Sequence, residues 1–190
     1  MISFMIGNIL KKDLYRYEGK KCENLWIQIR YVFFVPGFTY IFFMRKAQNA
    51  FPVTRWFYLI LLKLTSYITH IQIPYDTSIA EGFRIVHFGT IVIHPEAKIG
   101  RNFNISQGVI IGVAQGKRGG VPVIGDNVCV NANAVIFGGC HIGNDVLIAP
   151  GALVNFDVPD NSIVIGNPGK IIKKTESPTK KYIVYSLDKA

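Results

Sequence analysis

The 190-residue chain lacks the cysteine patterns of a disulfide-stapled or zinc-binding protein. Its three cysteines, Cys22, Cys129 and Cys140, are odd in number and include no C-x-x-C spacing. Such usage fits a reducing compartment. The sequence also lacks the charged leader, apolar stretch and cleavage site of a secretory signal. We therefore expect a cytoplasmic protein without disulfides.

Several catalytic signatures are missing as well. There is no G-x-S-x-G elbow, no P-loop and no dinucleotide-binding fingerprint. Ser106 has no acid–base partner at a recognisable spacing, so a covalent mechanism has no support in the sequence. No pair of histidines has metal-ligand spacing, and we expect no metal.

A basic binding surface is also lacking where it would be needed, although the formal net charge is +9. Residues 1–72 contribute +7 and residues 170–190 contribute +4, whereas residues 73–169 contribute −2. A nucleic-acid-binding protein usually concentrates its positive charge on the folded binding surface. Nucleic acid is therefore not an expected partner.

What the sequence does have is an aliphatic residue at every sixth position between Ile73 and Val154. The three runs are Ile73, Ile79, Ile85 and Ile91; Ile93, Ile99, Ile105 and Ile111; and Ile124, Val130, Ile136, Ile142, Ile148 and Val154. A helix has a period of 3.6 and an amphipathic strand a period of two, so neither explains the spacing. A short fixed period is typical of a stacked β-solenoid. We predict a mainly β fold in which residues 73–169 form roughly five three-sided coils.

Two interruptions of this period indicate where a site lies. Eight residues separate Ile85 from Ile93, so two extra residues fall in 87–90. Thirteen separate Ile111 from Ile124, across the glycine-rich, basic stretch 113–121. Interruptions of a repeat usually form loops on one face, often the binding face.

Residues 1–72 show no such period and hold 16 of the 24 aromatic residues. Four helices are expected, over 4–17, 23–34, 38–50 and 54–70, and the breaks at Pro36-Gly37 and Pro52 separate the last three of them. The apolar run 31–44 is too short and too interrupted to span a bilayer. Two compatible interpretations remain open. The region caps the open end of the solenoid and meets a neighbouring subunit, or it makes a peripheral contact with the inner membrane.

The candidate for catalysis is His87, because it lies inside the first interruption, where the chain need not turn it into the core. An imidazole can take a proton from a hydroxyl near neutral pH. His70, His94 and His141 are expected to be structural. A basic tail, predicted to be mobile, occupies residues 170–190.

Seven phrases of the sequence resemble the hexapeptide-repeat acyltransferases, and among them the serine acetyltransferase-like branch. The phrases are 85–87, 89–93, 97–100, 107–112, 122–128, 157–162 and 166–170. The resemblance covers residues 73–174 and implies a left-handed parallel β-helix that works as a homotrimer with acetyl-CoA. Left-handedness is implied by the resemblance only, since the general crossover rule favours right-handed connections.

The resemblance also implies roles for individual residues. His87 matches the catalytic base that deprotonates the acceptor hydroxyl for attack on the acetyl-CoA thioester. The positions that match coenzyme A contacts are Gly112, Ala132, Ala134, Gly151 and Lys170. Lys117 and Arg118 in the second interruption could add positive charge for the phosphates.

Three positions depart from the serine acetyltransferase pattern. Val121 replaces a second histidine, Val86 replaces an aspartate before the catalytic histidine, and Gln72 replaces an acidic residue. Losing these groups removes charge pairing that would select serine. The shorter, more aromatic N-terminal region adds to a resemblance with acetyltransferases that modify capsular, exopolysaccharide or O-antigen sugars. The expected acceptor groove contains Gln72, Val86, Phe88 and Val121.

The leading hypothesis is therefore an acetyl-CoA-dependent O-acetyltransferase acting on a sugar hydroxyl, with the acceptor either a small molecule or a lipid-linked glycan. The first alternative is serine O-acetyltransferase of cysteine biosynthesis. The second is a solenoid scaffold without catalysis.

Overall fold

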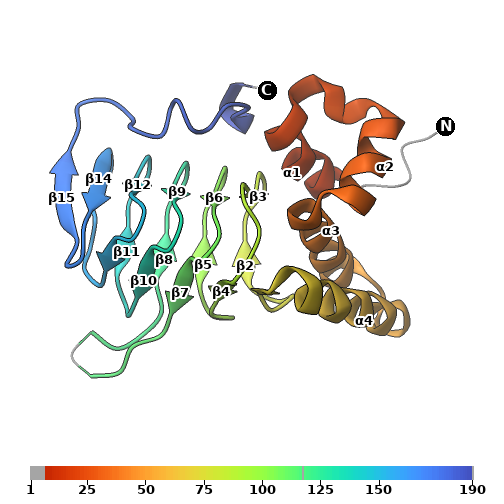
Figure 1. The fold of residues 1–190 in the computed structure, drawn as a ribbon, viewed down its shortest axis with the longest axis horizontal. Coiled ribbons are helices and arrows are strands. Elements are labelled where there is room, and N and C mark those ends of the chain that lie inside the picture. The colour runs from red at the N-terminus through yellow and green to blue at the C-terminus, as the bar shows by residue number, and fades with distance from the viewer. Residues whose placement is uncertain (1–6, 117, 190) are drawn as a thin grey trace.

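The computed structural model describes residues 7–116 and 118–189, which form a helical region joined to a three-sided solenoid (Figure 1). The helical region contains α1 (Asn8–Glu18), the 3-10 helix η1 (Gly19–Glu23), α2 (Leu25–Phe34), α3 (Pro36–Asn49) and α4 (Pro52–Thr69). Proline opens α3 and α4, where its missing N–H removes no helical hydrogen bond. The four α-helices begin and end within a few residues of the predicted ones; residues 4–6 of the first prediction lie outside the described part.

The solenoid consists of three sheets that each receive one strand per coil. Sheet A contains β1 (Ile71–Gln72), β4 (Ile91–Ile93), β7 (Ile110–Gly112), β10 (Val135–Phe137) and β13 (Leu153–Val154). Sheet B contains β2 (Ser78–Ile79), β5 (Lys98–Ile99), β8 (Val123–Ile124) and β11 (His141–Ile142). Sheet C contains β3 (Arg84–Ile85), β6 (Asn104–Ile105), β9 (Cys129–Val130), β12 (Leu147–Ile148), β14 (Ser162–Ile165) and β15 (Lys170–Lys173).

The six-residue period places its aliphatic residues inside the coils. All fourteen are at most 5% exposed, and equivalent positions pair between coils, as at Ile85 and Ile105. Asparagine takes the left-handed conformation at several corners, with φ of 57° at Asn127 and 60° at Asn133. The predicted fold class, a parallel β-helix preceded by a small helical region, is confirmed.

The helical region covers the first coil, as one of the two interpretations predicts. The Tyr40 hydroxyl donates to the Ile73 carbonyl at 2.8 Å and accepts from the Ile73 N–H at 2.9 Å. Tyr17 makes the same two bonds with Ile85, at 3.0 and 2.9 Å. A β-carbon at Gly37 of α3 would lie 3.0 Å from the Ile85 side chain, so glycine permits this close approach. The tyrosine hydroxyls thus hydrogen-bond to backbone groups that would be unpaired at an open end of the solenoid.

The C-terminal residues are packed, which corrects the expectation of a mobile tail. β15 pairs antiparallel with β14 and covers the last edge of sheet C. Residues 174–189 then run back along the solenoid to the short helix η2 (Leu187–Lys189), beside α1 (Figure 1). Ile183 is buried against Cys129 and Leu147 on the outer face of sheet C. Because these apolar side chains face outward from sheet C, burying them under the tail is favourable. This explains why the tail runs along sheet C.

Candidate active site

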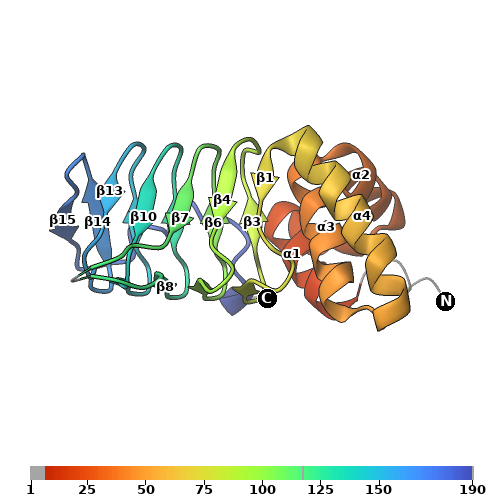
Figure 2. The same ribbon diagram turned by 90° about the horizontal axis from the view of Figure 1, so that it is seen from below.

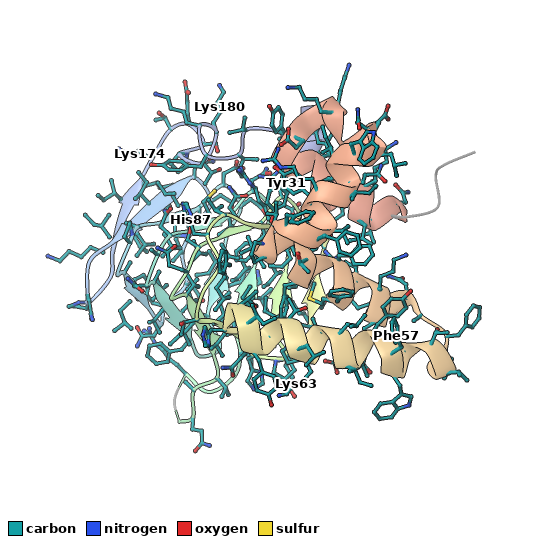
Figure 3. The ribbon with its side chains drawn as sticks, turned by 45° about the vertical axis from the view of Figure 1, so that its right-hand side comes forward. Tyr31, Phe57, Lys63, His87, Lys174 and Lys180 are labelled. Atoms are coloured by element: carbon teal, nitrogen blue, oxygen red, sulfur yellow. The ribbon has the colours of Figure 1, made fainter. Side chains whose placement is uncertain are left out.

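The corner between β3 and β4, which carries His87, is two residues longer than its counterpart in the next coil. β3 aligns with β6 and β4 with β7, yet eight residues join Ile85 to Ile93 where six join Ile105 to Ile111. The extra length is taken up in a turn that leaves the His87 side chain exposed. Figure 3 shows His87 on the solenoid, apart from the α4 residues Phe57 and Lys63.

Within this corner, Gly89 and Thr90 both have positive φ, 121° and 46°. Threonine rarely adopts that conformation, so the turn is held in place by its neighbours. One such contact is the N–H of Gly108 in the next coil, which donates to the Gly89 carbonyl at 3.0 Å. Phe88 is 49% exposed beside His87.

The three sheets form the three sides of the solenoid and meet at three edges. His87 lies in the first coil, on the edge where the chain passes from sheet C to sheet A. We name this the C-to-A edge. The corner containing Ala132 and the corner containing Gly151 belong to it, joined by the Gly151 N–H donating to the Ala132 carbonyl at 2.9 Å. At the far end, Lys170 follows a turn that is hydrogen-bonded to Leu153 of sheet A. The structure therefore brings His87 and three predicted coenzyme A contacts onto one edge.

The outer face of sheet A adjoins this edge and is mostly apolar. Its aligned outward positions are Gln72, Val92, Ile110, Val135 and Leu153. Ile110 is 41% exposed, although it is an aliphatic residue in the middle of a sheet. An apolar row of this kind suits contact with another molecule.

The second interruption forms a hairpin on the opposite edge of sheet A, between sheets A and B. Ala114 and Gly120 pair antiparallel across it. Arg118 donates from Nη1 to the Asn155 carbonyl at 2.6 Å, and its own carbonyl accepts from Gly139 at 3.0 Å. The hairpin therefore lies along later coils and places Arg118 at the border of sheet A, near Gly112 at the end of β7. Lys117 lies outside the described residues.

A cavity of about 710 Å³ opens where α4 meets the first two coils of sheet A. Gln72 and Val92 of the sheet A row line it, together with Lys63, Tyr67, His70 and His94. His70 and His94 were expected to be structural, and no pattern in the sequence pointed to Lys63 or Tyr67. No sequence signal identifies the cavity, because it forms between a helix and a coil whose relative placement the repeat does not specify.

The remaining predicted site residues do not lie together with His87 in the single chain. Val86 lines a small pocket of about 80 Å³ on sheet C, with Tyr182 of the tail. Val121 packs against the core at the hairpin exit. Ala134 is fully buried, and its backbone N–H and C=O are bonded within the solenoid. Within the described residues no group of three His, Cys, Asp or Glu side chains could hold a metal ion.

Stacked coils of three short parallel strands and six-residue repeats define a hexapeptide-repeat, left-handed β-helix. Residues 122–155 match the family described as bacterial transferase hexapeptide (six repeats).

Known proteins similar to the chain fall into two groups. A 2,3,4,5-tetrahydropyridine-2,6-dicarboxylate N-acetyltransferase of Staphylococcus aureus (strain JH9) is 38% identical over 93 residues, which are 47% of this chain and 39% of that protein. The chain thus matches well under half of that relative's length. Among solved structures, a serine acetyltransferase of Neisseria gonorrhoeae is 27% identical with a TM-score of 0.71, covering 92% of this chain and 69% of that one. Soybean serine acetyltransferase is also 27% identical, with a TM-score of 0.69 and coverage of 85% and 67%.

Proposed function

We propose that the protein is an acetyl-CoA-dependent acetyltransferase in which His87 is the general base. The observation that carries the proposal is the exposed histidine on a lengthened corner, at the head of the edge that also holds Ala132, Gly151 and Lys170. Both groups of similar proteins are named as acetyltransferases, although their acceptors differ.

The proposed reaction is a direct transfer. His87 takes the proton of the acceptor hydroxyl as the hydroxyl oxygen attacks the thioester carbonyl carbon. The carbon–sulfur bond then breaks, and the coenzyme A sulfur leaves with the proton returned by the imidazolium. Acetyl-CoA is a cytoplasmic metabolite, so the proposed place of action is the cytoplasm.

Coenzyme A is proposed to lie along the borders of sheet A, in the groove between this chain and a neighbouring solenoid. Small residues at Gly112, Ala132 and Gly151 leave room for a narrow pantetheine arm beside the apolar row. Arg118 and Lys170 are exposed cations at the borders of this face and suit the phosphates. A serine acetyltransferase solved in complex with CoA shares the fold, with a TM-score of 0.69 at 23% identity.

The apolar face of sheet A supports the proposal of a homotrimer. The row Val92, Ile110, Val135 and Leu153 is apolar and partly exposed in the single chain. A neighbouring solenoid would cover it. In such a trimer, residues of neighbouring subunits would come together. The predicted acceptor residues, which lie apart in the single chain, could then share one groove; they are Gln72, Val86, Phe88 and Val121.

The acceptor has two candidates, and the comparisons favour serine over a sugar. The likeness to serine acetyltransferases extends over 85% to 92% of the chain and so includes helical residues as well as the solenoid. The residues at the site favour a glycan, because Gln72, Val86 and Val121 offer no charge to an amino acid. An unpaired ammonium or carboxylate against such a surface costs free energy.

Steady-state transfer with thiol release as the readout separates these candidates. L-serine and a panel of nucleotide-linked sugars and oligosaccharides would be compared as acceptors with the same enzyme preparation. Saturable turnover of serine at sub-millimolar concentration would establish the serine alternative. Turnover of a sugar with kcat/KM at least about a hundredfold above that of serine would establish the glycan.

A scaffold without catalysis is tested separately by coenzyme A binding. A ligand at a hundred times its Kd adds about 2.7 kcal/mol to the free energy of unfolding. A melting temperature that stays unchanged with excess coenzyme A would contradict the proposed function.

A further inference from the structure

Helix α4 carries apolar side chains on the face that points away from the protein. The exposed set, here called the outer stripe, is Val53, Trp56, Phe57, Ile60, Leu64, Tyr67 and Ile68. Each is between 53% and 87% exposed. Their spacing of three and four residues keeps them on one side of the helix.

The opposite side of α4 already packs on the protein. Leu62, Thr65 and Thr69 are buried, and α4 lies against α3 and β1. The outer stripe is therefore a second apolar face, and the core does not account for it. An exposed apolar patch of this extent marks an interaction surface.

The charge around the outer stripe has one sign. Residues 24–75 contain five Lys or Arg residues and no Asp or Glu. Arg45 is buried in an ion pair with Asp13, and Arg55 is half-buried, with its guanidinium 5.9 Å from the ring centroid of Tyr75. Lys63 is therefore the exposed cation of α4. The Lys63 ammonium lies 5.0 Å from the ring centroid of Tyr67, so charge and aromatic surface are adjacent.

We propose that the outer stripe of α4 docks on an anionic lipid surface, with the helix lying in the plane of the interface. Apolar and aromatic side chains would enter the boundary between headgroups and acyl chains, while Lys63 meets lipid phosphates. Among the described helices none is alone long and apolar enough to cross a bilayer, and α2 and α3 pass only as a pair bent by 97°. The arrangement is peripheral.

A second copy of the chain fits the outer stripe less well. A two-fold interface brings the same patch of both copies together. Lys63 would then approach its own counterpart, with no acidic residue between positions 24 and 75 to pair with it. Anionic lipid supplies the opposite charge.

The two tryptophans of the chain allow a direct test with the full-length protein. Trp26→Phe leaves Trp56 of the outer stripe as the single reporter, 72% exposed in the absence of lipid. With phosphatidylglycerol vesicles, Trp56 emission should shift to the blue and become protected from an aqueous quencher. High salt should reverse most of the effect, because surface attraction is screened within about 8 Å at physiological ionic strength.

Two outcomes would overturn the proposal. One is an unchanged Trp56 spectrum with anionic vesicles at low salt. The other is a blue shift that appears on raising the protein concentration without lipid, which would indicate self-association. The measurement involves neither acetyl-CoA nor an acceptor, so its failure is distinct from failure of the proposed function.

Vesicle co-sedimentation of surface variants adds a matched comparison. Phe57→Ser combined with Ile60→Ser should weaken binding by at least about tenfold, because two apolar side chains no longer enter the lipid. Lys63→Gln should weaken binding to anionic vesicles about fivefold. Val184→Ser is the control, since Val184 is 62% exposed on the tail, which runs along the upper side in Figure 1, whereas α4 lies along the lower side. Equal loss in the control would contradict docking through α4.

Discussion

Tyr17 and Tyr40 each supply hydrogen bonds that a neighbouring strand would otherwise make to the first coil. A neighbouring strand would offer a donor and an acceptor to the edge of the first coil, and each tyrosine hydroxyl offers both to one residue. Burial raises the pKa of Tyr40 to about 12, so its hydroxyl remains a donor across the neutral range.

Removing one of these hydroxyls should therefore destabilise the protein. Tyr40→Phe leaves the N–H and C=O of buried Ile73 without partners, and each unpaired buried group costs about 1–3 kcal/mol. The free energy of unfolding from urea titration should fall accordingly. Tyr67→Phe is the control, since Tyr67 is exposed on α4. Equal stability of both variants would contradict a bridging role for Tyr40.

Replacing His87 tests the proposed catalysis. General-base catalysis contributes about 10²–10⁴-fold, so His87→Ala should lower kcat by that factor while the Kd for coenzyme A changes little. His141→Ala should behave like wild type, because His141 is exposed on sheet B. The proposed role of His87 does not survive if the alanine variant retains full turnover with the preferred acceptor.

Buried thiols should resist alkylation in the folded protein. Burial raises the pKa of Cys129 to about 12 and that of Cys140 to about 11. Near pH 9 an unfolded chain would hold much of each group as thiolate, whereas the folded chain keeps the thiol. Stability from these groups is present below pH 9 and declines as the pH rises toward the folded pKa values. Iodoacetamide labelling followed by mass spectrometry should modify both only after addition of urea.

At the scale of elements, one buried ion pair ties two helices to the first coil. Arg45 of α3 donates from Nε to Asp13 of α1 at 2.9 Å, and both side chains are at most 2% exposed. Asp13 also accepts from Gly82 and Phe83, while Arg45 donates to the Ile79 and Ala80 carbonyls. Burial raises the pKa of Asp13, although Arg45 and the two N–H groups act in the opposite direction.

Breaking this pair should be costly only when one partner is left behind. Asp13→Ala strands a buried guanidinium and should cost about 3–5 kcal/mol in the free energy of unfolding. Asp13→Ala combined with Arg45→Met should cost less than the sum of the two single substitutions. Additive losses in urea titrations would contradict a coupled pair.

The six-residue period was sufficient to predict the coils, because each aliphatic position has one environment, the interior. The proline breaks likewise located the starts of α3 and α4. The contacts of Asp13, Tyr17 and Tyr40 could not be predicted, since they join residues 32 to 70 positions apart through side chains. The tail was one of two candidates to cover an open end of the solenoid, but it was predicted to be mobile because Lys170–Lys173 shows no alternation and looks solvated. His87 was predicted from the two-residue insertion in the repeat. The cavity beside α4 could be identified only from the folded structure.

At the scale of the whole molecule, a homotrimer is expected. Three solenoids would bury the apolar row of sheet A, whose strands β1, β4, β7, β10 and β13 are labelled in Figure 2. Light scattering should give three times the 21.3 kDa chain mass. Ile110→Glu should shift the mass toward the monomer, because it places a carboxylate on this row. A wild-type monomer at micromolar concentration would rule out a shared site.

The cavity beside β1 has α4 as one wall, and Lys63 and Tyr67 belong both to that wall and to the surface around the outer stripe. With α4 lying on lipid, an acceptor anchored in the bilayer would reach the cavity by lateral diffusion, a search in two dimensions. An acceptor dissolved in water would search three. Turnover would then follow the density of acceptor per membrane area, so diluting the sample at constant vesicle composition should leave the rate per bound enzyme unchanged.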